Sequence, residues 1–342
     1  MYSFESDYTE GAHPKILRLL AETNLEQTKT YGEDPYSRKA ALLIKEQIDR
    51  ENAEVFFISG GTQTNLIAIS AFLRPHEAVI SADTGHIEVH ETGAIEATGH
   101  KVIPVPSCDG KLYPETILPV FRFHVEEHMV KPRMVYISNA TELGTVYSVD
   151  EITALHSFCR ENDMLLYLDG ARIGAALTAD GADLTFEHLG RFTDAFYIGG
   201  TKNGALLGEA LVVQNPALAR DMRYIIKQRG GLLAKGRLLG LQFLALFEDG
   251  LFWELARHAN TMATILRNAI REIGYPEMAE SPTNQLFPIL PNDMIAALRK
   301  DYIFRIIEAT DDVNSCIRLV TSWATQEADV RAFANALSRL SV

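Results

Sequence analysis

Residues 167–208 decide the fold of this chain. They contain YLDGARIGAAL (residues 167–177) and, after a connector, DAFYIGGTKNGALLG (residues 194–208). Each segment holds an apolar run typical of a strand, and each run is followed by one reactive side chain, Asp169 in the first and Lys202 in the second. Ligands of open α/β sheets bind in the crevice at the carboxyl ends of the strands. We therefore expect Asp169 and Lys202 to share one ligand site.

Each of these two residues has a simpler explanation when taken alone. An aspartate such as Asp169 is common in a loop near the start of a helix, and a lysine between glycines is common as a solvated loop residue. Their order, each after an apolar run, favours a common site. An amine that forms a Schiff base and a carboxylate that keeps a pyridinium nitrogen protonated are what pyridoxal 5′-phosphate (PLP) chemistry requires.

The residues and their order resemble the fold-type-I PLP-dependent enzymes, specifically the threonine aldolase and aromatic amino acid β-eliminating lyase family. The resemblance covers nearly the whole chain, from the segment around Ser6 to RLVT at residues 318–321. It implies an α/β fold in which a large domain carries a mostly parallel seven-stranded sheet between helices. We expect an N-terminal arm and helix (1–30), the PLP-binding domain (31–240) and a smaller C-terminal α+β domain (241–342).

A phosphate site is predicted where SGGTQ (residues 59–63) follows a β-branched and aromatic run. A glycine-rich turn that opens a helix presents free N–H groups and the positive end of the helix dipole. Neither GxGxxG nor GK[ST] is present, which argues against dinucleotide and Walker-type sites. A plain strand–turn–helix with Thr62 as the N-cap is the alternative. With Lys202 downstream, we expect Gly61, Thr62 and Gln63 to bind the PLP phosphate, and Thr201 to contact the cofactor.

His86 and His90 are four residues apart, as metal ligands on a helix are. The HExxH order and a third ligand at a familiar spacing are both missing, so we expect no metal. The resemblance implies instead that His86 stacks on the pyridine ring. We expect His86 also to handle a proton, His90 to be structural and Glu91 to be a supporting partner. The family's second histidine, in an ENTHN-like segment, is replaced here by NATE at residues 139–142. Glu142 or a water held by His86 would then have to act as the base.

Arg318 lies on a predicted strand among apolar neighbours, where an arginine is costly unless it is paired. The resemblance implies that its guanidinium binds the substrate α-carboxylate, for which the fork of donors is suited. Pairing with a surface acid is the alternative. Arg172 and Ser6 are further candidates for binding the substrate.

The composition excludes several classes of partner. A net charge of −13 argues against nucleic acid and anionic membrane surfaces, which both require clustered basic residues. No run approaches the roughly 20 apolar residues of a membrane span. The N-terminal residues lack a signal-peptide pattern, and the three cysteines are scattered as in a reducing cytoplasm. The resemblance implies a homodimer or homotetramer with shared active sites.

The predicted activity is retro-aldol cleavage of a β-hydroxy-α-amino acid, of the L-threonine or L-allo-threonine type, to glycine and an aldehyde. The competing predictions are another PLP-dependent reaction, β-elimination or transamination, and a relative that has kept the fold without the cofactor. A non-enzymatic relative would have a broken set of site residues. Here the whole set is present: His86, Asp169, Arg172, Lys202 and Arg318.

Overall fold

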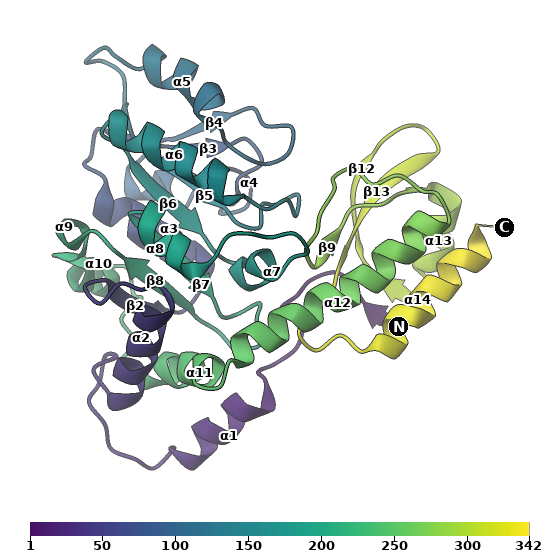
Figure 1. Ribbon diagram of the computed structural model, residues 1–342, viewed down its shortest axis with the longest axis horizontal. Helices are drawn as coiled ribbons and strands as arrows, with labels where there is room; N and C mark the ends of the chain where they lie inside the picture. Colours follow the sequence, from purple (N-terminus) through teal and green to yellow (C-terminus); the bar gives the residue numbers. More distant parts are fainter. Residues whose placement is uncertain (342) are drawn as a thin grey trace.

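The computed structural model describes residues 1–341 and has two parts that are joined by a long helix (Figure 1). The larger part holds a seven-stranded sheet of order β2-β8-β7-β6-β5-β3-β4. Only β8 runs against its neighbours, which confirms the predicted mostly parallel sheet. The strands are β2 (Glu54–Ile58), β3 (Glu77–Ala82), β4 (Val102–Val105), β5 (Lys131–Ser138), β6 (Leu165–Asp169), β7 (Ala195–Gly199) and β8 (Glu209–Val213).

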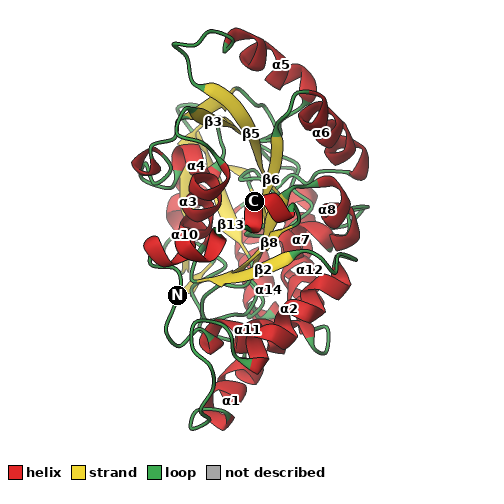
Figure 2. Ribbon diagram, turned by 90° about the vertical axis from the view of Figure 1, so that its left-hand side faces the viewer, coloured by secondary structure: helices red, strands yellow, loops and turns green. Residues whose placement is uncertain are grey.

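Helices cover both faces of this sheet (Figure 2). One face is covered by α3 (Gly61–Phe72), α4 (His86–Val89) and α10 (Met222–Gln228). The helices on the other face are α2 (Pro35–Gln47), α5 (Pro114–Phe123), α6 (Val149–Glu161), α7 (Ile173–Leu177), α8 (Phe186–Phe192) and α11 (Arg237–Phe247). Two shorter segments, the 3₁₀ helix η1 (Glu96–Thr98) and helix α9 (Pro216–Ala219), complete this part.

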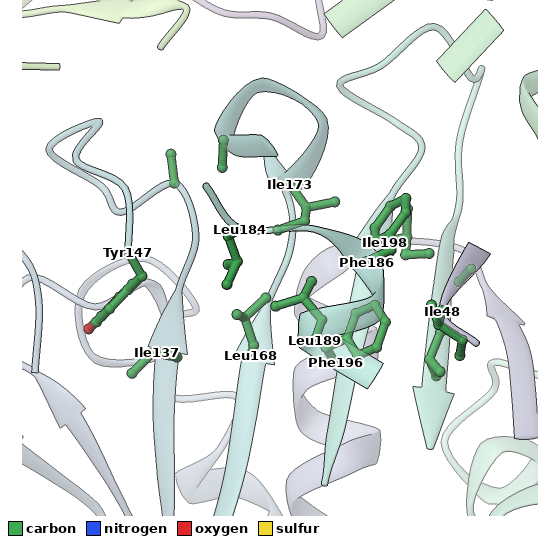
Figure 3. Packing of buried hydrophobic residues seen from close by; sticks show 14 of the residues in the cluster. Ile48, Ile137, Tyr147, Leu168, Ile173, Leu184, Phe186, Leu189, Phe196 and Ile198 are labelled. Atoms are coloured by element: carbon green, nitrogen blue, oxygen red, sulfur yellow. The ribbon is translucent and has the colours of Figure 1, made fainter. Parts of the chain in front are cut away.

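Strand β6 shows why the apolar run before Asp169 is continuous. All of its residues are buried, because a central parallel strand is covered on both faces. Leu166 and Leu168 point into the core on the α8 side, and Leu165 and Tyr167 point into the core on the α3 side. Figure 3 shows Leu168 packed among residues of β7, α7 and α8. Packing on both faces fixes the strand end that presents Asp169.

The smaller part is built on a four-stranded sheet. Strands β10 (Ile289–Pro291) and β12 (Arg305–Ala309) pair antiparallel with β13 (Asn314–Val320), as does β9 (Gln285–Leu286). Helices α13 (Asn292–Leu298) and α14 (Glu327–Leu340) pack against this sheet. An antiparallel sheet with helices on one side is an α+β arrangement.

The joining helix is α12 (Leu251–Glu272), which belongs to both cores (Figure 1). Leu255, near its start, packs in the core of the large sheet, and Leu266 and Ile270, near its end, pack in the core of the small part. Helix α11 spans the expected division after residue 240. That division stays a prediction.

The N-terminal arm joins the small part before the chain enters the large one. Strand β1 (Tyr2–Ser3) pairs in parallel with β11 (Tyr302–Ile303). The side chain of Phe4 is fully buried, its N–H donates to the carbonyl of Ile303 at 2.8 Å, and its carbonyl accepts from Val320 at 2.9 Å. Helix α1 (Pro14–Glu22) follows and lies beside α11 at the lower edge of the molecule in Figure 1.

Within residues 1–341, none of the helices has both the length and the apolar character needed to span a bilayer. The same residues contain no group of three or more His, Cys, Asp and Glu side chains placed to hold a metal ion. All three cysteines are free: Cys108 is exposed, and Cys159 and Cys316 are buried.

Candidate active site

A cavity of about 530 Å³ lies between the two parts of the molecule. It is lined by groups from the large part, from the small part and from the N-terminal arm. The lining groups that carry charge or can titrate are Tyr8, Asp83, His86, His90, Glu142, Arg172, Lys202, Arg305 and Arg318. This cavity therefore brings together five residues of the predicted site that come from separate elements: His86, Arg172, Lys202, Arg318 and Glu142.

Asp169 ends β6 and is only 3% exposed. Its Oδ2 accepts hydrogen bonds from the hydroxyl of Tyr136 at 2.6 Å and from the amide of Asn65 at 2.9 Å, and its Oδ1 accepts the N–H of Ala171 at 3.0 Å. Burial alone would raise the pKa of this carboxyl. The charge of His86 and the hydrogen-bond donors outweigh burial, so the pKa lies below its ordinary value. Asp169 is therefore held as an anion.

Asn65 links this carboxylate to a second one. Its amide nitrogen also donates to Oε1 of Glu91 at 2.7 Å, and the same oxygen contacts Nδ1 of His86 at 2.8 Å. Burial lowers the pKa of His86, but the hydrogen bond to Glu91 and the charge of Asp169 outweigh it, so the pKa lies above its ordinary value. The imidazole is therefore oriented by Glu91 and favoured in its charged form.

Lys202 lies in the loop between β7 and β8, where the backbone is held by Glu209. Oε2 of Glu209 accepts the N–H of Gly200 at 3.0 Å, and Oε1 accepts the hydroxyl of Thr201 at 2.9 Å. Burial lowers the pKa of Lys202, and the charge of Arg172 lowers it further, against the pull of the neighbouring carboxylates. This is the direction that favours a nucleophilic amine.

Two arginines face the cavity with different partners. Arg172 donates from Nε to Oδ2 of Asp7 at 2.8 Å and from Nη2 to Oδ1 at 3.1 Å. Asp7 also accepts the amide of Asn284 at 2.9 Å. Arg318 donates Nη2 to the carbonyl of Glu5 at 3.3 Å, whereas its buried Nε has no partner within residues 1–341. Arg318 thus has a buried donor available for an anionic ligand.

The first turn of α3 lies beside Asp169. A Cβ on Gly61 would come within 3.1 Å of the hydroxyl of Tyr197, a group close enough to Asp169 to help lower its pKa. The N-cap is Gly60, which has no side chain to cap the helix, so the alternative of Thr62 as the N-cap is wrong. The first N–H groups of a helix have no intrahelical acceptor, and here they are those of Gly61, Thr62 and Gln63.

Some predicted residues lie near the cavity without lining it. Thr201 donates its hydroxyl to Glu209 and accepts the N–H of Gly208 at 3.0 Å. The hydroxyl of Ser6 accepts the N–H of Tyr8 at 3.2 Å in the arm. The side chain of Gln63 bonds Ser59 at 2.5 Å and the carbonyl of Arg229 at 3.0 Å.

Sequence reasoning missed several residues of the site. Asp7, Asn65, Tyr136, Tyr197 and Glu209 come from five different elements, and each bonds or contacts a predicted residue. Two of these residues could have been recognised from the sequence. Asn65 is polar among the apolar residues of α3, and Glu209 is charged at the start of a buried strand. The other three follow only from strand register or from the path of the arm.

Comparison with known proteins gives a consistent result. The model of the β-eliminating lyase family matches residues 3–292. A low specificity L-threonine aldolase from a Pseudomonas species is 34% identical over 338 residues, which are 97% of this chain and 95% of the relative. The solved structure of Leishmania major threonine aldolase superposes with a TM-score of 0.99 at 50% identity and covers 100% of both chains.

A more distant structure shows the same fold. Aspartate aminotransferase from Thermus thermophilus, solved with maleate, superposes with a TM-score of 0.74 at 15% identity and covers 99% of this chain and 91% of that one. The predicted fold-type-I architecture is thus confirmed.

Proposed function

Because this chain belongs to the β-eliminating lyase family, we propose that it is a PLP-dependent aldehyde-lyase. The substrate is a β-hydroxy-α-amino acid of the L-threonine or L-allo-threonine type, and the products are glycine and an aldehyde. The observation that carries this proposal is one cavity that is lined by the amine of Lys202 and by the guanidinium of Arg318, whose Nε has no partner within residues 1–341, with the ionised Asp169 beside it. The Pseudomonas and Leishmania major relatives, which match 97% and 100% of this chain, are threonine aldolases by name.

The residues that line this cavity and those beside it fit PLP. The uncapped first turn of α3 offers N–H groups and a positive dipole end to a phosphate, and a Cβ added at Gly60 would meet no other atom within 4 Å, so there is space for the ligand. Asp169 offers an anion for a pyridinium nitrogen, and Lys202 offers an amine whose pKa is lowered mainly by burial. In this proposal Gly61, Thr62, Gln63 and Thr201 hold the phosphate end, and His86 lies over the ring.

When bound, PLP withdraws electrons from the substrate's α-carbon through its protonated pyridine ring. Asp169 keeps the proton on the ring nitrogen, because a buried carboxylate with a lowered pKa favours a cation beside it. Tyr136 and Asn65 hold the carboxylate in place. Lys202 would hold the cofactor through its amine, whose pKa is lowered mainly by burial and which is therefore suited to act as a nucleophile.

The arginines orient the substrate. Arg318 binds the α-carboxylate through the face that includes its unpaired Nε, since a guanidinium offers parallel donors to the two oxygens. Arg172 adds positive charge at the same wall, with its position fixed by Asp7, and Ser6 lies next to that aspartate. Fixing the carboxylate limits which bond at the α-carbon can stand perpendicular to the ring.

We further propose a homodimer or homotetramer in which neighbouring chains share their active sites, and a cytoplasmic location. Leu25 and Leu42 are 92% and 58% exposed on the side of α1 and α2, which supports burial by a second chain. Three free thiols support a reducing compartment. Light scattering at several protein concentrations tests the assembly.

Product analysis tests the activity. The PLP-loaded protein is given L-threonine, and glycine plus acetaldehyde are quantified against ammonia plus 2-oxobutanoate. Glycine and acetaldehyde in equal amounts are expected. Ammonia and 2-oxobutanoate would instead assign the chain to β-elimination, and absence of both product pairs with every β-hydroxy amino acid tried would overturn the proposal.

A further inference from the structure

Glu142 is a buried acid that the proposed function leaves without a role. It follows β5 and lines the same cavity as Lys202 and Arg318. Its Oε1 accepts two hydrogen bonds, from the hydroxyl of Ser138 at 2.7 Å and from the N–H of His86 at 3.0 Å. Its Oε2 is buried and has no partner within residues 1–341. An unpaired carboxylate oxygen at a ligand cavity is costly unless a ligand pairs with it.

The surroundings of Glu142 suit a proton acceptor. Burial raises the pKa of this carboxyl, and the negative charge of Asp169 raises it further, while Ser138 and the charge of His86 oppose them. Arg172 and Tyr136 also lie within electrostatic range of Glu142. A general base is most effective when its pKa lies close to the working pH, and this shift is in that direction.

We infer that Glu142 is the general base that removes the β-hydroxyl proton of the substrate. This inference rests on the proposed cleavage. The O–H bond breaks as its proton passes to the carboxylate, and the electron pair of that bond forms the second bond of the aldehyde C=O. The Cα–Cβ bond breaks, and its electron pair stays with the glycine fragment. One proton added at Cα balances the one removed, so the amino acid yields glycine and an aldehyde with nothing else consumed.

The two histidines of the cavity are less suited to this role. Nδ1 of His86 is bound to Glu91, and the raised pKa of His86 favours the form that carries no free lone pair. Partial burial lowers the pKa of His90, and the charge of His86 lowers it further, so the ring is favoured in its neutral form. Much of the residue is nevertheless exposed, and no hydrogen bond within the described chain orients its side chain. Glu142, by contrast, is held in place through its Oε1 and keeps an Oε2 that has no partner within residues 1–341.

The test compares cleavage with a reaction that does not involve a hydroxyl. Glu142→Gln keeps the shape and the acceptor for Ser138 and His86 but cannot take a proton. We expect kcat for threonine cleavage to fall by about 10²-fold or more, the usual contribution of a general base. Exchange of the α-hydrogen of glycine for deuterium, followed by NMR, should stay near the wild-type rate, because glycine has no β-hydroxyl. The PLP affinity, from an absorbance titration, should also be retained.

Two further variants serve as controls. Glu88→Gln makes the same chemical change at an exposed residue of α4 outside the cavity lining, and should leave both reactions unchanged. His90→Asn tests the rival base, and its loss of cleavage should be much smaller than that of Glu142→Gln. Glu142→Asp should recover part of the cleavage rate, because it restores a carboxylate.

The outcomes separate the possibilities. Parallel loss of cleavage, exchange and PLP affinity in Glu142→Gln would mean a structural role and would overturn the inference. A wild-type rate of cleavage by Glu142→Gln would also overturn the inference. Loss of cleavage with retained glycine exchange in His90→Asn would assign the base to His90. A wild-type protein that exchanges glycine but cleaves no β-hydroxy amino acid would refute the proposed function itself, which is a different result from any change in the variant.

Discussion

Asp7 holds the guanidinium of Arg172 with both carboxylate oxygens, at 2.8 and 3.1 Å. The carboxylate is 1% exposed and comes from the N-terminal arm, whereas Arg172 follows the strand that carries Asp169. The arm therefore helps to build the wall of the candidate site. Its Asp7 supplies the negative charge that pairs with Arg172, although the two residues are far apart in the chain.

Replacing Asp7 by Asn should destabilise the protein by about 3–5 kcal/mol at neutral pH, as expected when one member of a buried ion pair is removed. Burial raises the pKa of Asp7, but Arg172 and Lys202 outweigh it, so the folded pKa is lowered. The stabilisation is thus fully present above the pKa of an unfolded aspartate, about 3.9, and is lost as the pH falls through the lower folded value.

Urea unfolding of wild type and Asp7→Asn between pH 3 and pH 7 measures this contribution. The difference in free energy of unfolding should narrow on acidification. Glu10→Gln, at an exposed acid of the same arm, is the matched control and should show no comparable difference. A gap of constant size at every pH would contradict the assignment to an ion pair.

Lys202→Ala should abolish both cleavage and the covalent attachment of PLP, because within residues 1–341 no other lysine lines the cavity. The absorbance that the wild-type protein gains on addition of PLP, and retains after gel filtration, should be missing from the variant. Lys300→Ala removes an exposed lysine and should behave as wild type. Retention of turnover by Lys202→Ala would remove Lys202 from the proposed site.

Tyr136→Phe should remove one of the hydrogen bonds that fix the carboxylate of Asp169 and should lower the free energy of unfolding. The hydroxyl donates to a charged carboxylate at 2.6 Å, and such bonds contribute about 1.5–3 kcal/mol. Tyr167 is an equally buried tyrosine of the next strand whose hydroxyl donates to the neutral oxygen of Asn65 at 3.0 Å. Tyr167→Phe should therefore cost less, about 1 kcal/mol.

Free energies of unfolding and PLP dissociation constants should be measured for both variants. Loss of the Tyr136 donor raises the pKa of Asp169 and so weakens the anion that faces the pyridine nitrogen. The Tyr136→Phe protein should therefore bind PLP more weakly, whereas the Tyr167→Phe protein should not. Equal effects of the two changes on both quantities would show that the hydroxyl of Tyr136 does not tune Asp169.

Glu209→Gln should gain stability relative to wild type as the pH rises. Burial raises the pKa of Glu209 to about 8, although Thr201 and Lys202 oppose it. An unfolded glutamate ionises near pH 4.3. Between these values the folded state binds more protons than the unfolded state, so the wild-type protein loses stability with rising pH, and above about pH 8 the full cost of the buried charge is present.

Urea midpoints at several values between pH 5 and pH 9 follow this difference. Glutamine keeps an acceptor for the N–H of Gly200 and has no proton to lose. Glu187→Gln, at an exposed acid, should show the same pH dependence as wild type. Parallel curves for wild type and Glu209→Gln would show that Glu209 has no raised pKa.

The large sheet and the placement of the two central residues could be predicted because they depend on local sequence. Continuous apolar runs mark strands buried on both faces, and in a parallel sheet their carboxyl ends meet at one edge. This is why Asp169 and Lys202 could be assigned to one site. Asn65 and Glu209 stand out locally as polar residues among apolar ones. Which side chains they and Tyr136 contact depends on which strands and helices become neighbours, and no local pattern specifies that.

The small sheet was harder to predict. The sequence predicts one strand over residues 284–289, whereas the structure has β9 and β10 on either side of Pro288, which has no N–H for a ladder. Strand β12 was missed because all its residues are exposed, including Ile306 and Ile307, so its sequence has no alternation of buried and exposed positions. Its pairing with β13 could not be read from local sequence.

The pairing of the arm with the small part has a consequence for how the protein is made. Synthesis runs from the N-terminus, so Phe4 leaves the ribosome long before Ile303 and Val320, the residues to which its backbone bonds. The first segment to be translated is therefore among the last to find its place. A transcript cut short before these codons would yield a chain in which the arm cannot dock, and Arg172 would be left without its buried counter-charge.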